Sequence, residues 1–166
     1  MAYKHVDNIV IENARIIFKN FSGKEGRFNR EGDRNFCVVI DDPDMANKLK
    51  ADGWNIKAVA PRDPAEEPLN YIPVAVSFRY NPPRVFMRTG KTQVQLTEET
   101  IGSLDNAYIE TADVAIRPYN WEVSGNHGIK GYLKTLYVTI EKDEFEDKYS
   151  TPSIAPNDIS EEEVPF

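Results

Sequence analysis

The sequence predicts a mainly β fold: one small barrel or sandwich, followed by a tail without fixed structure. Runs rich in β-branched and aromatic residues are short, and clusters of Gly, Pro, Asn and Asp separate them. No segment repeats at a fixed period. A chain of 166 residues with 40% hydrophobic content can bury one core. We therefore expect one domain over residues 1–149 and a tail over residues 150–166.

Seven strands are expected along the domain. The clearest is residues 71–78, where apolar Ile72, Val74, Val76 and Phe78 occupy every second position and so mark one buried face. The longer runs are expected to be bent or interrupted. In chain order the expected strands cover residues 8–21, 34–41, 54–60, 71–78, 84–88, 107–123 and 129–140.

One or two short helices are also expected. In the first, Asp42 can cap the N-terminus, Pro43 suits the first helical position, and Gly53 can end the helix. The second is expected over residues 97–104, with Glu98 and Glu99 at its positive end. We interpret both helices as structural.

The formal net charge of −7 comes from the C-terminal end. From residue 141 onward nine acids face two lysines, whereas acids and bases balance in the preceding residues. The segment after residue 149 contains three prolines and few apolar residues, so we expect it to be disordered. The negative total therefore does not exclude a nucleic-acid ligand for the domain.

The chain shows no signal for a membrane or an oxidising compartment. No run approaches the roughly 18 apolar residues that span a bilayer, and the N-terminus lacks the apolar region of a signal peptide. We expect a cytoplasmic protein. The single cysteine, Cys37, excludes an intramolecular disulfide and a cysteine-based metal site, and we interpret it as a buried small hydrophobic residue.

Residues 115–137 predict a β-hairpin with rings and cations on one surface, because alternate side chains of a strand share a face. With a four-residue loop, the opposite pairs would be Trp121 and Lys130, Tyr119 and Tyr132, and Arg117 and Lys134. Rings interleaved with cations can stack bases and hold phosphates. The alternative is that the rings belong partly to the core and the cations serve solubility.

A second basic and aromatic stretch covers residues 79–88. No acid occurs between residues 68 and 97. Apolar residues alternate with Arg84, Phe86 and Arg88, which places these three outward on the expected strand. Arg79 alternates with the core series of the preceding strand and is also expected outward. We include all four among the candidate DNA contacts.

The connection over residues 21–34 predicts a mobile clamp. It combines three glycines with aromatic rings and cations between two strands. Its candidate contacts, with one residue before it, are Lys19, Lys24, Arg27, Phe28, Arg30 and Arg34. A phosphate-binding P-loop is disfavoured, because a strand follows and no Gly-Lys-Ser/Thr ending is present. An ordinary connection between strands is the alternative.

The sequence offers no constellation for catalysis or metal binding. No Ser/His/Asp, Cys/His or zinc-spaced set appears, and His5 and His127 stand in a terminal segment and a hairpin loop. The acids at Asp42 and Asp44 suit a helix cap and a helix N-terminus. We expect no enzyme activity, no metal and no cofactor. A nuclease built on scattered carboxylates is the alternative.

Four motifs resemble phage proteins described as single-stranded DNA-binding OB-fold proteins. They are FNREGDRNF at residues 28–36, DGWN at 52–55, IRPYNWEV at 116–123 and KTLYVT at 134–139. The resemblance covers most of residues 8–149. It implies an OB-like β-barrel acting in phage DNA replication, recombination or repair, in the cytoplasm of a bacterial host.

The C-terminal ending resembles the acidic tip of bacterial single-stranded DNA-binding proteins, where acids precede an apolar residue, Pro and a terminal Phe. In that group the tip docks on replication and repair enzymes. The resemblance implies the partner-binding residues Glu161, Glu162, Glu163, Val164, Pro165 and Phe166. Glu replaces the more usual Asp and Val replaces a longer aliphatic residue, departures that bear on affinity rather than on the role.

Together these features predict a non-catalytic protein that binds single-stranded DNA and recruits replication or recombination proteins through its tail. The alternative from another class is a β-sheet adaptor that contacts only proteins. RNA is a second alternative as the bound strand, because stacking and phosphate contacts need not sense the 2′-hydroxyl. The sequence is also compatible with a homo-oligomer.

Overall fold

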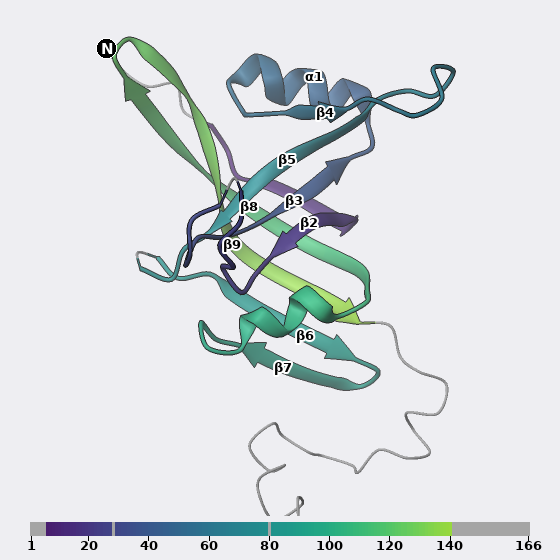
Figure 1. Cartoon of the computed structure of the whole chain (residues 1–166), viewed down its shortest axis with the longest axis vertical. Helices are drawn as coiled ribbons and strands as arrows, with labels where there is room; N and C mark the ends of the chain where they lie inside the picture. Colours follow the sequence, from purple (N-terminus) through teal and green to yellow (C-terminus); the bar gives the residue numbers. More distant parts are fainter. Residues whose placement is uncertain (1–5, 28, 80, 141–166) are drawn as a thin grey trace, which may run out of the picture.

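The computed structural model describes residues 6–27, 29–79 and 81–140, which form a mainly β structure (Figure 1). The first half contains β1 (Ile9–Ala14), β2 (Ile16–Asn20), β3 (Arg34–Ile40), α1 (Pro43–Asp52), β4 (Lys57–Val59) and β5 (Leu69–Val76). The second half contains β6 (Arg84–Thr89), β7 (Thr92–Leu96), the 3-10 helix η1 (Ile101–Asn106), β8 (Ile109–Val123) and β9 (Asn126–Ile140). The long first run is interrupted into β1 and β2, as predicted.

The main path of the sheet runs β1-β8-β9-β5-β3-β2. Its two edge strands are consecutive segments joined by Arg15, whose carbonyl oxygen accepts a hydrogen bond from the backbone nitrogen of Val39 (3.0 Å). Strands β1 and β2 thus form one bent segment that supplies both edge strands of this path. The sheet curves into a barrel, but it is not closed by pairing between its edge strands. Strands β5 and β9 pair in parallel, whereas the other neighbours on this path are antiparallel. This architecture confirms the expected mainly β, OB-like fold.

Alternation along the central strands separates the core from an outer face. In β5, Ile72, Val74 and Val76 are buried, while Pro73 and Ala75 between them lie on the opposite side. In β3, Cys37 pairs with Pro73 and lies on that outer side too. The outer face of β3, β5 and β9 is therefore available for a ligand.

Helix α1 begins and ends where the sequence predicts. The Asp42 side chain accepts a hydrogen bond from the backbone nitrogen of Asp44 (2.9 Å), and Gly53 ends the helix with a left-handed φ of 109°. The carbonyl oxygen of Gly53 accepts a hydrogen bond from the backbone nitrogen of Ile129 (3.0 Å). This contact ties the end of α1 to β9 and leaves Trp54 buried, with 3% of its surface exposed.

Three elements differ from the sequence prediction. The second helix, predicted over residues 97–104, is present as the 3-10 helix η1 but begins later, at Ile101, because the Thr97 backbone nitrogen donates to Oγ1 of Thr100 (2.7 Å) in a turn before it. Strand β7 was not predicted, although it pairs with β6 around a tight turn in which Gly90 has a φ of 61°. Strand β4 is shorter than residues 54–60, because Trp54 turns into the core.

The loop after β2 is fastened to η1 by one carboxylate. Asp105 accepts hydrogen bonds from the backbone nitrogens of Phe21 (2.6 Å) and Ser22 (3.0 Å) and from Oγ of Ser22 (2.6 Å). Burial alone would raise the pKa of Asp105. The three hydrogen bonds and the charge of Lys24 outweigh burial and lower this pKa from its ordinary value of 3.8.

Acid should weaken this fastening. Because the folded pKa of Asp105 is lowered, its ionised form contributes stability that is present above the ordinary carboxylate pKa and is lost as pH falls through the lower folded value. Asp105→Asn should therefore reduce the free energy of unfolding at neutral pH and flatten its decline in acid. Denaturant unfolding at several pH values measures both effects. Asp63→Asn, at a carboxylate that accepts a hydrogen bond from the Ala65 backbone (2.9 Å), is the control; an equal effect there would contradict the prediction.

Candidate nucleic-acid interface

The hairpin of β8 and β9 extends from the barrel as an arm (Figure 1). A two-residue turn at Ser124 and Gly125, with φ values of 50° and 84°, closes it in place of the predicted four-residue loop. The predicted opposite pairs were therefore wrong by two residues. The observed pairs are Arg117 with Tyr132, Tyr119 with Lys130, and Trp121 with Gly128. A shift of two residues keeps each side chain on its face, so the predicted shared surface is retained.

Tyr132 is the centre of the aromatic and basic cluster on this arm. The Arg117 guanidinium carbon lies 5.7 Å from the Tyr132 ring centroid, and Nζ of Lys130 lies 5.1 Å from it. The ring of Tyr119 meets Tyr132 edge-on, with 5.9 Å between centroids. Both cations lie within the range of a cation–π contact, so this cluster holds positive charge beside exposed aromatic surface.

Trp121 lies flat against the neighbouring strand. A Cβ atom at Gly128 would come within 2.9 Å of Cζ2 of Trp121, so only glycine leaves room for the indole ring there. The contact covers one side of the ring, and Trp121 is still 37% exposed, compared with 53% for Tyr119. Both rings therefore present surface to which a base can stack.

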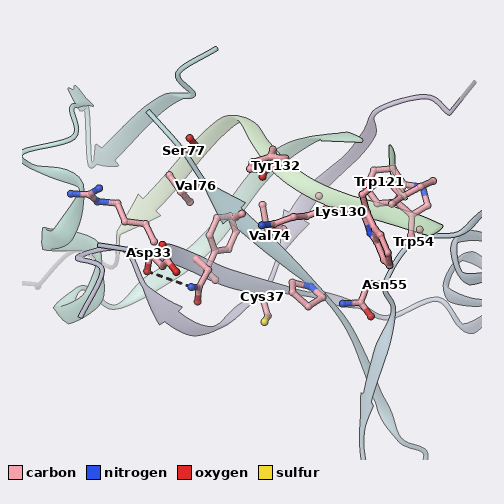
Figure 2. Close-up of a pocket in the computed structure, with 18 of the residues that line it drawn as sticks. Asp33, Cys37, Trp54, Asn55, Val74, Val76, Ser77, Trp121, Lys130 and Tyr132 are labelled. Atoms are coloured by element: carbon pink, nitrogen blue, oxygen red, sulfur yellow. Dashed lines mark hydrogen bonds between the residues drawn. The ribbon is translucent and has the colours of Figure 1, made fainter. Parts of the chain in front are cut away.

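A groove of about 1160 Å³ runs from the arm across the outer face of β9, β5 and β3. Figure 2 shows Trp121, Tyr132 and Lys130 along one part of this groove and Cys37 across from them. The side chains of Ala75 and Tyr132 are neighbours across the parallel pair β5 and β9. Positive charge in the lining comes from Arg34, Lys57, Arg79 and Lys130, and negative charge from Asp33 and Glu98.

The surroundings of Arg34 and Cys37 in the groove partly compensate the charge of the first and raise the pKa of the second. Arg34 forms an ion pair with Glu98 (3.3 Å between Nη1 and Oε2) and lies over the Phe78 ring at 5.9 Å, so its charge is partly compensated. Burial raises the pKa of the Cys37 thiol to about 11, with a smaller opposing effect from Lys57. Cys37 is half-buried in the groove wall, not fully buried as the sequence suggested, because strand alternation turns its neighbours Phe36 and Val38 inward.

The second predicted platform, on β6, is a ladder of rings and cations that contact one another. Phe86 stacks on Tyr137 with 4.7 Å between centroids. The guanidinium carbon of Arg84 lies 5.5 Å from the Phe86 ring centroid, and that of Arg88 lies 5.2 Å from the Tyr137 ring centroid. Nε of Arg88 also donates to Oε1 of Gln93 (3.0 Å). The two rings stack on each other, whereas both arginines remain exposed.

The loop between β2 and β3, for which the sequence predicts a mobile clamp, is folded around one amide. Nδ2 of Asn29 donates to the carbonyl oxygens of Lys24 (2.8 Å), Arg30 (3.1 Å) and Asp33 (3.0 Å). Oδ1 of Asn29 accepts from Nδ2 of Asn35 (2.8 Å), which joins the loop to β3. The loop that carries the exposed Lys24, Arg27 and Arg30 adjoins the groove, because Asn29, Gly32, Asp33 and Arg34 line it.

Other predicted residues lie elsewhere. Nζ of Lys19 donates to the carbonyl oxygens of Leu104 (2.9 Å) and Ala107 (2.7 Å), so its charge is used within the fold. Lys134 is exposed at a β-bulge, where β9 carries one more residue than β8. The predicted contacts outside the described residues are Phe28, Glu161, Glu162, Glu163, Val164, Pro165 and Phe166.

Sequence reasoning missed two residues of these surfaces. Lys57 lines the groove from β4, a strand too short to show alternation. Tyr137 faces outward against Phe86 because the bulge at Lys134 changes the alternation of β9, and a bulge leaves no clear mark in a sequence.

Within the described ranges, no three His, Cys, Asp or Glu side chains gather as a metal site. No helix among these residues is long and apolar enough to cross a membrane.

An open OB-like barrel whose groove combines exposed rings with cations is typical of proteins that bind single-stranded nucleic acid. The chain belongs to the phage single-stranded DNA-binding family: the family model described as "Putative phage ssDNA-binding domain" matches residues 1–165. No curated protein is significantly similar to the chain.

Solved structures from bacteriophage Enc34 have a similar fold. The C-terminally truncated single-stranded DNA-binding protein of that phage matches with a TM-score of 0.55 and 14% identity, over 82% of this chain and 87% of that chain. The same phage protein in complex with single-stranded DNA matches with a TM-score of 0.52 and 14% identity, over 82% and 88% of the two chains. At these identities the similarity supports the OB-like fold.

Proposed function

We propose that this chain is a non-catalytic protein that binds single-stranded DNA during phage DNA replication, recombination or repair. One observation carries the proposal: Trp121 and Tyr132 line one groove on the outer face of the sheet together with cations, and Tyr119 meets the Tyr132 ring beside it. Every base has a face that can stack on a ring, so such a surface binds strands with little sequence preference. Membership of the phage single-stranded DNA-binding family supports the same ligand.

Phosphates would be held by exposed or half-buried cations around these rings and on β6. We assign this role to Arg79, Arg84, Arg88, Arg117, Lys130 and Lys134, with Lys24, Arg27, Arg30 and Arg34 at the loop end of the groove. Phe86, stacked on Tyr137, would orient the guanidinium of Arg84 instead of stacking on a base. Lys19 is left out, because two carbonyl oxygens bind its ammonium group.

Titration with labelled oligo-dT and with a duplex of equal length tests this function. We expect tighter binding of the single strand and a steep loss of affinity with salt, because each phosphate contact on a single strand adds about 0.7 to the log–log slope. Arg84→Ala and Arg88→Ala should each flatten that slope by about this amount. Lys48→Ala, on the exposed face of α1, is the control. No binding of oligo-dT would favour the adaptor alternative.

The acidic tail would have two functions. The resemblance of residues 159–166 to bacterial tips supports docking of Phe166 in an apolar pocket of a replication or recombination protein. The surplus negative charge of the tail would also compete with DNA for the cations of the groove. DNA binding would then release the tip for its partner.

Two truncations separate these functions. Removal of residues 151–166 deletes four acids and no base, which changes the net charge from −7 to −3. This variant should bind oligo-dT more tightly, and the gain should shrink as salt screens the charges. Deletion of Phe166 alone keeps all the acids, so it should leave DNA affinity unchanged while partner capture is lost. Equal losses of DNA binding in both variants would show that the tail belongs to the fold.

A further inference from the structure

An exposed aromatic side chain stands at a β-bulge in β2. Ile17 pairs with Cys37 and Asn20 pairs with Asn35, so β2 carries one residue more than β3 between these pairs. Phe18 lies in the bulge with a φ of 51°, a left-handed conformation that is unfavourable for a bulky residue. Despite this cost its ring is not in the core: Phe18 is 60% exposed.

The bulge directs Phe18 to the face that carries the groove. Its ring meets Tyr71 edge-on, with 5.5 Å between centroids and 73° between planes. Tyr71 lies one position before buried Ile72 in β5, and so it shares the outer face with Pro73, which lines the groove. The Phe18 and Tyr71 rings therefore lie on the same side of the sheet as Tyr132.

A lysine stands beside this aromatic pair. Lys57 of β4 is the cross-strand partner of Tyr71, and directly opposite residues of paired strands share a face. Lys57 is exposed and lines the groove, so the groove reaches the neighbourhood of the pair. Two rings and a cation at this end repeat the chemistry found around Tyr132 on the arm.

We infer that the DNA track continues across the sheet to Phe18 and Tyr71, where one base stacks and Lys57 holds a phosphate. This inference rests on the function proposed above and extends the site beyond the residues assigned there. The strands β9, β5, β3 and β2 are consecutive in the sheet, so the extension spans roughly 15 Å at the usual spacing between strands. Strained backbone conformations are frequent at functional positions, and Phe18 has such a conformation.

The dependence of affinity on oligonucleotide length tests the inference. Phe18→Gly removes the ring and suits the positive φ, so the variant should fold with unreduced thermal stability. We expect oligo-dT of about 4 nucleotides, bound by the richer arm end, to bind equally well to both proteins, within the range of site sizes of OB folds. For about 16 nucleotides the variant should lose about 5- to 150-fold in affinity, the effect of one stacked base. Tyr108→Ala, an exposed ring outside the groove lining, is the matched control and should change neither.

A fluorescent base locates the contact directly. Oligo-dT carrying one 2-aminopurine should change its emission on binding when that base reaches the pair, and Phe18→Gly should abolish the change at that position only. Identical length dependence in wild type and variant would overturn this inference and leave the function proposed above intact. Failure of the wild-type protein to bind any length would overturn that function, and the inference with it.

Discussion

Trp121→Ala should weaken the binding of oligo-dT by about 1 to 3 kcal/mol, the contribution of one stacked base. Gly128 supports one side of the indole ring, so the ring is held ready for a base and needs no rearrangement on binding. Quenching of tryptophan emission should disappear in the same variant, because the remaining Trp54 is buried. Fluorescence anisotropy of a labelled strand gives the affinity independently of the intrinsic signal.

The matched control for Trp121→Ala is Tyr108→Ala. Tyr108 is 80% exposed and lies outside the groove lining, so its removal should leave affinity unchanged. Gly128→Ala offers a second test of the same ring, since the added methyl group would displace the indole without deleting it. Unchanged affinity in a folded Trp121→Ala protein would remove the arm from the proposed interface.

Trp54→Ala should have the opposite profile, costing about 3 to 5 kcal/mol of unfolding free energy, as is usual for the truncation of a large buried ring. Trp54 joins the end of α1 to the sheet: its backbone forms a parallel bridge with Ile129, and its ring lies 3.5 Å from the position that a Cβ atom at Gly131 would take. Truncation would leave a cavity beside these strands, and a close-packed interior relaxes only partially into such a cavity. Urea unfolding monitored by circular dichroism measures the loss.

Measuring both stability and DNA affinity for variants at the two tryptophans separates their roles. Trp54→Phe keeps an aromatic ring and should fold well enough for its affinity for oligo-dT to be measured, which should match that of the wild type. Trp121→Ala should keep most of its stability, because its ring is partly in solvent. Trp54 is assigned to the core and Trp121 to the ligand. This distinction would be wrong if the variants at both positions lost unfolding free energy and affinity for oligo-dT to the same extent.

The face of the arm could be predicted from sequence because it depends on parity alone. The turn at Ser124 and Gly125 is two residues shorter than predicted, yet an even shift leaves Tyr119 and Trp121 on the side of Tyr132. Helix α1 was predictable for a different reason, since Asp42 and Gly53 each act within a few residues of the chain. Helix caps and the face on which a strand residue lies can therefore both be predicted without knowledge of the tertiary structure.

The remaining parts depend on contacts between distant residues. Lys19 looked like a DNA contact until the carbonyl oxygens of Leu104 and Ala107, far along the chain, were brought to it. The exposed ring of Phe18 depends on a bulge that follows from the pairing of β2 with β3. The ring of Phe86 looked free because the bulge that turns Tyr137 toward it was not visible in the sequence. Such features require the strand register, which no short window of sequence contains.

Strand β9 is the last strand along the described part of the chain, yet it lies in the middle of the sheet between β8 and β5. During synthesis, the edge of β5 at Val74 and Ala75 must therefore stay unpaired until residues 131 and 132 leave the ribosome. Long-range parallel pairing of this kind is intrinsically slow to form. A chain interrupted before β9 consequently lacks Lys130 and Tyr132, so its groove is missing the wall that carries this ring and this cation.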